Sequence, residues 1–383
     1  MHSGFQFHLP TKIIFGFGKT QELGQLPFGM KRAFLVTDRG VMQAGILEQV
    51  TKVLSEHGIS FTIYDEVEPD PSVETIDFAA KAYIDSDCDA IIAVGGGSPI
   101  DAAKGIRAVA SNGGSIRDYA GVNLLKKPSS IPFVAIPTTS GTGSEVTIFA
   151  VFSDWQEKRK VTVTSPYLAP DISIVDPKLT LSAPAGITAA SGMDAFAHAA
   201  ETFVSRISQP ASDALALSAM RTAVQYLRRA VYNGEDQEAR IKMAEASLLA
   251  GMAFNQSYLG LTHAIGSALS GHAHVSHGVA IALLLPSVMD YNLVSAVEKY
   301  AEIAAVFRPA DPTKSTMEIA KQGVQDLTQL RDDLGLPTTL REVGVKEEQI
   351  PLIAEDTLKS GMWKFNPRKA SPEHVQALLK TIY

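Results

Sequence analysis

The sequence contains one cysteine, Cys88, among 383 residues. A single thiol excludes a disulfide within the chain and any metal site built on several thiolates. So little cysteine also suits a reducing compartment, and we expect a cytoplasmic protein. The first ten residues, MHSGFQFHLP, lack the charged and then apolar pattern of a signal peptide, which agrees with that expectation.

Long runs of one residue class are also missing. No basic run is longer than KRK at 158–160, and the net charge of −7 gives no electrostatic attraction to nucleic acid or to an anionic membrane. The longest apolar stretch, VAIALLLP at 279–286, is far too short to span a bilayer. We therefore expect neither a nucleic-acid nor a membrane partner.

The chain changes character near its middle. Before that point, short β-branched runs such as RAFLVTD (32–38) and AIIAVGGGS (90–98) alternate with helical patterns, which is typical of a parallel sheet covered on both faces. After it, long helical patterns such as 212–234 dominate, and no clear strand pattern is present. We predict an α/β domain at 1–185 and an all-α domain at 186–383.

A glycine-rich segment, GGGSPIDAAKG, follows one of the predicted strands. Ser98 stands where a helix N-cap belongs, Pro99 at the first helical position and Asp101 three residues after the cap, which predicts a capping box. Gly96 and Gly97 would let a phosphate approach the backbone at a helix N-terminus. The GxGxxG fingerprint is absent, so a plain strand-to-helix turn is the alternative interpretation.

Two further features point to a dinucleotide. The segment PTTSGTGSEVT (137–147) carries several hydroxyls beside glycines at the end of a strand, a pattern that can hydrogen-bond phosphates and ribose, although a solvated polar loop is the alternative. Asp38 ends another strand and could accept from an adenine ribose while repelling the 2′-phosphate of NADP. An Asp that only caps a turn before Gly40 explains the same pattern.

Metal-ligand chemistry is suggested by a carboxylate and several imidazoles. Asp194 and His198 are four residues apart and share one face of a predicted helix, although an Asp in a first turn with a partly buried His is the alternative. Four of the nine histidines lie between 263 and 277. One straight helix would place the first and last about 21 Å apart, so we expect the chain to turn between them, which Gly266 and Gly271 permit.

Four segments, GGGSPIDAAK, PTTSGTGSEVT, GMDAFAHAAE and HGVAIALLLPSVM, occur in the order and spacing of one family. By these motifs the whole chain resembles the iron-containing alcohol dehydrogenases. The resemblance implies an α/β dinucleotide-binding domain, a helical domain of the kind shared with dehydroquinate synthase, and a cleft between them that holds NAD(P) and a divalent metal. It also implies a homodimer, in which the strand-like N-terminus FQFHLPTKIIFG could pair across the two copies.

The resemblance assigns roles to individual residues. The implied metal ligands are Asp194, His198, His263 and His277. The implied cofactor contacts are Asp38, Gly96, Gly97, Ser98, Thr138, Thr139, Thr142 and Lys160. The implied substrate contacts are Phe254, Ser267 and His272. The carboxylate at position 38 favours NAD, and a site without thiolates favours Fe²⁺, with Zn²⁺ as the alternative ion.

The chain departs from the family pattern around the expected substrate pocket. Ser267 occupies a position where many members carry a second histidine, and NQSYLG (255–260) and GHAHVS (271–276) are also atypical. Ethanol is therefore a doubtful natural substrate. His272 and His274 could contact a polar or anionic substrate, or could line a solvent-facing turn.

The sequence thus predicts an NAD- and metal-dependent alcohol dehydrogenase that transfers hydride between a small primary alcohol or aldehyde and nicotinamide. A dehydroquinate synthase-like lyase, a glycerol dehydrogenase-like polyol oxidoreductase, and a nucleotide-binding protein with a structural metal are the alternatives. Glu201 could orient a metal ligand or lie on the surface.

Overall fold

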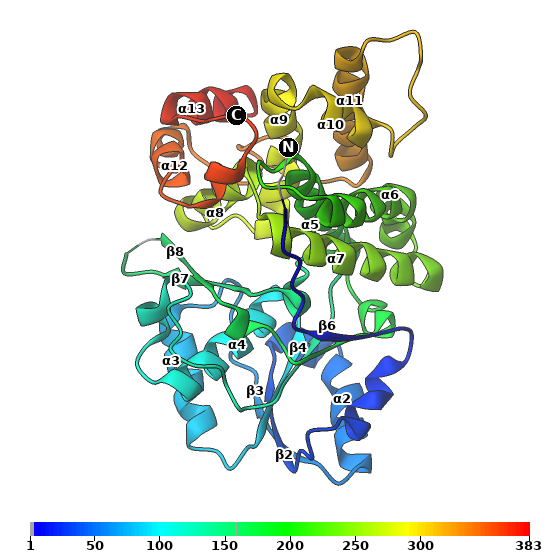
Figure 1. The fold of residues 1–383 in the computed structure, drawn as a ribbon. Coiled ribbons are helices and arrows are strands. Elements are labelled where there is room, and N and C mark those ends of the chain that lie inside the picture. The colour runs from blue at the N-terminus through cyan, green and yellow to red at the C-terminus, as the bar shows by residue number, and fades with distance from the viewer. Residues whose placement is uncertain (1–3, 158) are drawn as a thin grey trace. The chain divides into compact units, whose positions relative to one another are not determined.

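A computed structural model describes residues 4–157 and 159–383 (Figure 1). The chain forms two compact units. One unit comprises Leu9–Ala183, and the other comprises Pro184–Tyr383 together with residues 4–8. The change between the units falls two residues before the boundary predicted after residue 185.

The first unit is built on a six-stranded parallel sheet in the order β1-β9-β6-β4-β2-β3. Its strands are β1 (Lys12–Phe15), β2 (Arg32–Val36), β3 (Ser60–Tyr64), β4 (Ala90–Gly95), β6 (Phe133–Pro137) and β9 (Ile172–Val175). The inner strands β2, β4 and β6 are almost entirely buried, as a sheet covered on both faces requires.

Helices cover both faces of this sheet, as Figure 1 shows. They are α1 (Arg39–Gln43), α2 (Ile46–Glu56), α3 (Val73–Ile84) and α4 (Gly97–Asn112). Phe34 and Val36 of β2 pack with α3 and α4, whereas Ala33 and Leu35 pack with α2 on the opposite face. Successive residues of one strand therefore enter two different cores, which explains why the β-branched runs are apolar throughout.

A small second sheet in the same unit was not predicted from the sequence. It has the order β5-β8-β7, with β5 (Gly121–Val122), β7 (Phe149–Asp154) and β8 (Arg159–Thr164). The strands β7 and β8 form an antiparallel hairpin. Trp155 and Gln156 stand in its turn, where a tight hairpin usually carries glycine or asparagine, so the sequence carried no hairpin signal.

The strand order reverses beside β2. The chain runs from β2 outward to β3 and then returns to place β4 on the other side of β2. Val36 pairs with Ala93, so Asp38, just beyond β2, and Gly95, at the end of β4, follow the same carboxyl edge. Open α/β sheets bind ligands at such a switch point, outside the carboxyl ends of the strands.

The second unit is helical. Its helices are α5 (Ala185–Val204), α6 (Pro210–Tyr232), α7 (Gln237–Ser257), α8 (Leu261–Ala273), α9 (His277–Asn292), α10 (Val297–Ala304), α11 (Thr316–Asp333), α12 (Ile350–Thr357) and α13 (Pro372–Thr381). Within 184–383, which the structure describes throughout, no strand occurs. The predicted fold class, an α/β sheet unit followed by an all-α unit, is confirmed.

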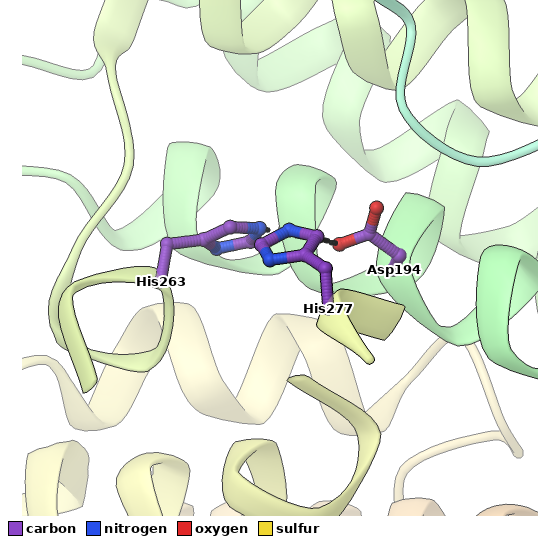
Figure 2. A group of neighbouring side chains, drawn as sticks. All are labelled: Asp194, His263 and His277. Atoms are coloured by element: carbon purple, nitrogen blue, oxygen red, sulfur yellow. Dashed lines mark hydrogen bonds and ion pairs between the residues drawn. The ribbon is translucent and has the colours of Figure 1, made fainter. Parts of the chain in front are cut away.

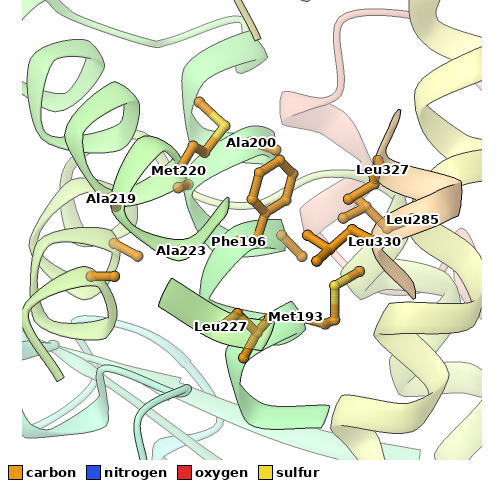
Figure 3. Close-up of a cluster of buried hydrophobic side chains, with 14 of the residues drawn as sticks. Met193, Phe196, Ala200, Ala219, Met220, Ala223, Leu227, Leu285, Leu327 and Leu330 are labelled. Carbon is orange, nitrogen blue, oxygen red and sulfur yellow. The ribbon is translucent and has the colours of Figure 1, made fainter. Parts of the chain in front are cut away.

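Helix α5 is the centre of the helical unit. From Gly192 to Val204 every residue is buried, and alanines let α6, α7 and α9 pack closely around it. Figure 3 shows Phe196 and Met193 of α5 among apolar side chains from the neighbouring helices. Because α5 is enclosed on all sides, the polar groups that it carries are held in a low-dielectric environment.

One stretch, His277–Ser295, is long and apolar enough to cross a membrane by length and composition, with a mean hydropathy of 1.4. It comprises α9 and the short turn that follows, and is longer than the apolar run considered in the sequence. Of this window, 61% is buried inside the protein. A core helix passes the same test, so the stretch is weak evidence for a membrane span.

Close packing between α5 and α6 predicts the effect of one substitution. A Cβ atom at Gly192 would lie 2.2 Å from Leu227 Cδ1, and Leu227 is fully buried. Gly192→Ala should therefore lower the free energy of unfolding by about 1–3 kcal/mol, the usual cost of overpacking a core. Urea unfolding of the purified variant measures this difference.

Gly186→Ala is the matched control on the same helix, because a Cβ there meets no atom within 4 Å. It should leave stability unchanged or raise it by up to about 1 kcal/mol, since alanine favours helix. A Gly192→Ala variant as stable as Gly186→Ala would contradict the packing described here.

Candidate functional site

The second unit gathers three imidazoles around one carboxylate oxygen. Asp194 is 2% exposed, and its Oδ1 lies 3.2 Å from His263 Nε2, 3.6 Å from His277 Nε2 and 3.7 Å from His198 Nε2. Figure 2 shows Asp194, His263 and His277, whose ligand atoms all lie within 4.8 Å of one another. His198 adds the third nitrogen near the same oxygen.

The donor set and its spacing fit a divalent ion. Donors held about 2.1 Å from a tetrahedral ion lie about 3.4 Å apart, close to the distances between Asp194 Oδ1 and the three imidazole nitrogens. Three neutral imidazoles and one carboxylate suit Fe²⁺, Zn²⁺ and neighbouring metals. Asp194, His263 and His277 therefore fit a shared ion, and His198 adds a nitrogen 3.7 Å from the Asp194 oxygen; the ligand role of all four residues stays a prediction.

Two glycines bring the histidine-bearing helices together. A Cβ on Gly278 would lie 2.9 Å from the Ala190 carbonyl oxygen, so the first turn of α9, which begins at His277, can approach α5 only with glycine there. A Cβ on Gly266 would lie 2.7 Å from Ile281 Cδ1, so this glycine lets α8 and α9 pack closely.

The chain turns between His263 and His277, as predicted, but neither Gly266 nor Gly271 makes the turn. Helix α8 runs through both glycines to Ala273, and the chain reverses at His274, whose φ of 53° is left-handed. Close helix packing, rather than backbone freedom, explains Gly266. The sequence gives no turn signal at His274, because histidine adopts this conformation only occasionally.

Electrostatics within the cluster favour an ionised Asp194. Burial alone would raise the pKa of this carboxyl group, but His198, His277 and His263 hold the pKa well below its ordinary value. Burial lowers the pKa of His263, but Glu201 and Asp194 outweigh that effect and raise it to about 9. The site is thus a buried carboxylate surrounded by imidazoles that can take up a proton or bind a cation.

Glu201 orients His263 from the far side of its ring. His263 Nδ1 donates to Glu201 Oε2 at 2.5 Å, and the Thr262 backbone N–H donates to Glu201 Oε1 at 2.6 Å. The bond at Nδ1 fixes the ring so that Nε2 faces Asp194, an arrangement common behind metal-binding histidines. Glu201 is only 5% exposed, which excludes the surface alternative.

The cluster is enclosed unevenly. The side chains of Asp194, His198 and His263 are 3–5% exposed, whereas that of His277 is 38% exposed. Phe254 stacks on His198 with ring centroids 4.7 Å apart, and His198 stacks on His263 at 4.6 Å. Solvent therefore reaches the group from the His277 side, while Phe254 covers the His198 ring.

The other predicted substrate residues lie on α8. Ser267 stands one turn after His263 and is partly buried. His272 Nε2 lies 2.5 Å from Asp356 Oδ2 on α12, so its ring is engaged with that carboxylate rather than with the metal-ligand group. Substrate contact by Ser267 and His272 stays a prediction.

In the first unit, the glycine loop (residues 95–98) opens α4 differently from the prediction. The N-cap is Gly96, with no side-chain cap, and the helix begins at Gly97. The predicted N-cap at Ser98 and its capping box with Asp101 are therefore wrong. Glycine can take the cap position without a side chain. Ser98 Oγ instead accepts from the Asp70 N–H at 3.2 Å.

The glycine loop lies against the hydroxyl loop (residues 138–147). The Thr138 N–H donates to the Gly95 carbonyl at 3.0 Å, and a Cβ on Gly97 would lie 2.9 Å from Thr142 Cγ2. A Cβ on Gly96 would lie 3.3 Å from Thr139 Oγ1. The bare backbone of Gly96 and Gly97 thus forms a cradle beside threonine hydroxyls at a helix N-terminus, which fits a phosphate.

The hydroxyls divide into two groups. Ser144 Oγ donates to Asp101 Oδ1 at 2.5 Å and accepts from Lys104 Nζ at 2.8 Å, so it braces the loop against α4. In the described parts of the chain, the hydroxyls of Thr138 and Thr139 make no hydrogen bond to the protein. These hydroxyls are available to a ligand.

Lys104 and Glu145 are two buried ionisable side chains that the sequence did not single out, and the Lys104 ammonium pairs with Asp101 Oδ1 at 3.5 Å. Lys104 is fully buried, and its ammonium donates to Ser144, to Thr147 at 3.0 Å and to the Phe149 carbonyl at 2.6 Å. Burial raises the pKa of Glu145 to about 7, although its own N–H and Lys104 act in the opposite direction. The sequence signal for this buried charge was a lysine within an alanine-rich, otherwise uncharged helical segment after Asp101, AAKG at 102–105.

Asp38 and Lys160, the remaining predicted cofactor contacts, have protein partners. Asp38 caps α1 by accepting from the Val41 N–H at 2.9 Å, as the alternative interpretation held. Lys160 Nζ lies 2.7 Å from Asp70 Oδ1. Because Asp70 also donates its N–H to Ser98, this pair connects Lys160 to the glycine loop. The cofactor roles of Asp38 and Lys160 stay predictions.

Comparison with known proteins yields two family matches that together cover most of the chain. Residues 10–177 match the model for iron-containing alcohol dehydrogenase, and residues 188–383 match the model for the C-terminal part of the Fe-containing alcohol dehydrogenase family.

Individual relatives cover nearly the full length. The chain is 38% identical over 376 residues to the NAD-dependent methanol dehydrogenase of Bacillus methanolicus, covering 98% of each chain. It is 39% identical over 383 residues to the 1,3-propanediol dehydrogenase of Klebsiella pneumoniae, covering 99% of each. A crystal structure of 1,3-propanediol oxidoreductase superposes with a TM-score of 0.96 at 40% identity, covering 99% of this chain and 100% of that one.

The buried Glu145 predicts a pH dependence of stability. Because its folded pKa is about 7 and its ordinary value is 4.5, its stabilising contribution is complete below about pH 4.5 and is lost as the pH rises through 7. Glu145→Gln should therefore lose less thermal stability between pH 5 and pH 8 than the unsubstituted chain, as measured by the unfolding midpoint at each pH.

The exposed Glu48→Gln on α2 is the control and should follow the unsubstituted chain at both pH values. Identical pH profiles for Glu145→Gln and the unsubstituted chain would contradict a raised pKa at Glu145.

Proposed function

This chain belongs to the iron-containing alcohol dehydrogenase family, and we propose that it interconverts a small primary alcohol and its aldehyde with NAD and a divalent metal ion. It is an NAD-dependent oxidoreductase that acts on CH–OH groups, like its relatives. The lyase and polyol alternatives are not favoured, because the full-length relatives are alcohol and diol dehydrogenases.

The observation that carries the proposal is the single oxygen of Asp194 facing three imidazole nitrogens within 3.7 Å. We assign Asp194, His198, His263 and His277 as the metal ligands. A bound Fe²⁺ or Zn²⁺ supplies a Lewis acid that polarises the alcohol or carbonyl oxygen, while NAD carries the hydride. The protein contributes fixed ligand geometry, with the side chains of Asp194, His198 and His263 only 3–5% exposed.

Residues around the ligands set that geometry. Glu201 holds His263 with its Nε2 toward Asp194, and Phe254 covers the His198 ring. The more exposed His277 marks the side from which a substrate approaches. Such enclosure keeps water away from the reacting carbon and strengthens the electrostatic effect of the site.

We assign cofactor binding to the carboxyl edge of the sheet. Gly96, Gly97 and Ser98 offer the α4 N-terminus to the pyrophosphate, and Thr138, Thr139 and Thr142 offer hydroxyls beside it. The carboxylate of Asp38 follows β2 at the same edge, where it favours NAD over NADP. Lys160 reaches the glycine loop through Asp70.

A homodimer in the cytoplasm is the assembly and location that we propose. Within the described sheet, β1 is an edge strand that pairs only with β9. The N–H groups of Lys12 and Gly16 donate to the β9 side, so those of Ile13 and Phe15 face the open edge. An unpaired edge is a template for pairing with a second copy. The lone Cys88 suits a reducing compartment.

Metal removal and reloading test the activity. The chain is stripped with a chelator, reloaded anaerobically with Fe²⁺ or Zn²⁺, and assayed for NADH oxidation with short neutral and anionic aldehydes. Activity should disappear with the chelator and return with one metal. Asp194→Asn should lose more than the roughly 100-fold that removal of an outer partner of a metal ligand costs.

Asp333→Asn is the matched control, because Asp333 is a partly exposed carboxylate paired with Arg228 on the surface. It should retain full activity. Absence of turnover with either metal and every aldehyde, despite NADH binding, would overturn the proposed reaction.

The oligomeric state is tested by light scattering. The unsubstituted chain should have twice the 41.0 kDa of one copy. Ile13→Pro removes an N–H that faces the open edge while sparing the bonds to β9, so it should yield the single-chain mass. A single-chain mass for the unsubstituted protein would contradict the dimer.

A further inference from the structure

We propose that Asn366 is a positioning residue that fixes the two histidine-bearing helices α8 and α9 to one another and thereby holds His263 and His277 at the metal-binding distance. This inference rests on the metal site proposed above. Asn366 follows the short helical turn Met362–Phe365 and is 2% exposed. It touches none of the metal ligands itself.

The amide of Asn366 is fully hydrogen-bonded. Its Oδ1 accepts from Asn292 Nδ2 at 2.9 Å and from the Leu261 N–H at 3.3 Å. Its Nδ2 donates to Asn292 Oδ1 at 2.7 Å and to the Arg368 carbonyl at 2.7 Å. Two donors and two acceptor positions are the full capacity of an asparagine amide. A fully satisfied buried amide network fixes its partners in one arrangement.

Asn366 is hydrogen-bonded to the start of α8, which carries His263, and to the end of α9, which carries His277. Leu261 is the first residue of α8 and stands two residues before His263. Asn292 is the last residue of α9, which begins at His277. One side chain therefore connects the start of the His263 helix to the end of the His277 helix.

The same contact reaches the carboxylate behind His263. A Cβ on Gly260 would lie 3.1 Å from both Asn366 Oδ1 and Glu201 Oε1, so the Gly260 backbone lies between the two oxygens. Glu201 accepts from Thr262 and His263, and Asn366 accepts from the N–H one residue earlier. Together the two side chains take the first N–H groups of α8, which have no partner within the helix.

The backbone of Tyr258, three residues before α8 begins, is strained, and contacts from residue 365 help to hold it in that conformation. Tyr258 has φ 57° and ψ 179°, a backbone region otherwise reserved for glycine. Its ring stacks on Phe365, with centroids 4.7 Å apart and planes at 15°. The Phe365 carbonyl accepts from the Arg206 N–H at 2.9 Å. Strained residues persist where surrounding contacts over-determine them, and here residue 365 supplies one such contact directly before Asn366.

The segment is also tied to α9 beyond Asn366. Arg368 Nη1 donates to the Tyr291 carbonyl at 2.7 Å, and its guanidinium lies 4.0 Å from the Tyr291 ring centroid. Tyr291 Oη donates to the Lys369 carbonyl at 2.6 Å. Asn366 is therefore anchored to α9 on its C-terminal side and to the start of α8 through its own amide.

Cobalt binding to the full chain tests this role. Co²⁺ affinity is measured by competition with a chelator, and the visible absorption of bound Co²⁺ reports ligand geometry. Asn366→Ala should weaken Co²⁺ binding about 10- to 100-fold, the range found when support of a metal ligand is removed, and should change the Co²⁺ spectrum. Asn292→Ala removes the other half of the amide pair and should produce a loss in the same direction.

Thr357→Val is the matched control. Thr357 is fully buried near the end of α12 and donates only to the Ile353 carbonyl of its own helix. This variant should lower the unfolding midpoint without altering Co²⁺ affinity or spectrum. The double variant Asn292→Ala/Asn366→Ala should bind Co²⁺ about as weakly as either single variant, and less weakly than the sum of two independent losses, because the two residues form one unit.

The outcomes separate this inference from the metal site itself. If the unsubstituted chain binds no Co²⁺, the proposed metal site fails and this inference fails with it. If the unsubstituted chain binds and Asn366→Ala binds with equal affinity and an identical spectrum, Asn366 is merely structural and only this inference is overturned. Should Asn366→Ala not fold, an unchanged affinity and spectrum in Asn292→Ala overturns it equally.

Discussion

The buried carboxylate of Asp194 is the constraint on which the helical unit depends. An ionised carboxylate inside an alanine-lined helix is unfavourable unless positive or donor groups surround it. Three imidazoles meet this need at one oxygen, and they come from three different helices. The requirement therefore fixes α5, α8 and α9 relative to one another, and a divalent ion would satisfy the same charge more completely than the imidazoles alone.

The need to surround Asp194 with imidazoles explains several neighbouring residues whose role would otherwise be read as packing alone. Gly278 lets α9 approach α5, and Gly266 lets α8 approach α9, so both glycines help to set the distances among Asp194, His263 and His277. Glu201 is a second buried carboxylate, and its pKa is lowered by His263 and Thr262 against the effect of burial. Each charge near the site is thus balanced by a neighbour, which keeps the cluster polar inside an apolar core.

The sequence allowed the fold class to be predicted because strand and helix periodicities are strong in both halves. It could not place the turn at His274, because Gly266 and Gly271 carried the turn signal but lie inside α8, where Gly266 serves close packing. Ser98 carried a cap signal, but glycine preceded it and opened the helix earlier. Asn366 carried no signal at all, since its role arises from contacts with residues about 75 and 105 positions away. Local patterns predict elements, whereas such distant contacts emerge only on folding.

In the first unit a buried cation, Lys104, fixes the surrounding loop, whereas in the helical unit a buried anion, Asp194, fixes the surrounding helices. At the carboxyl edge of the sheet, the hydroxyl loop leaves Thr138 and Thr139 without a side-chain hydrogen bond in the described residues, although Ser144 braces the same loop. Lys104 draws Ser144 and Thr147 inward, which braces the hydroxyl loop while Thr138 and Thr139 stay available. The glycine loop then needs no side-chain cap, because a cap would occupy the N–H groups that an anion requires. In both units, a buried charged side chain fixes the polar groups around it: Asp194 in the helical unit and Lys104 in the sheet unit.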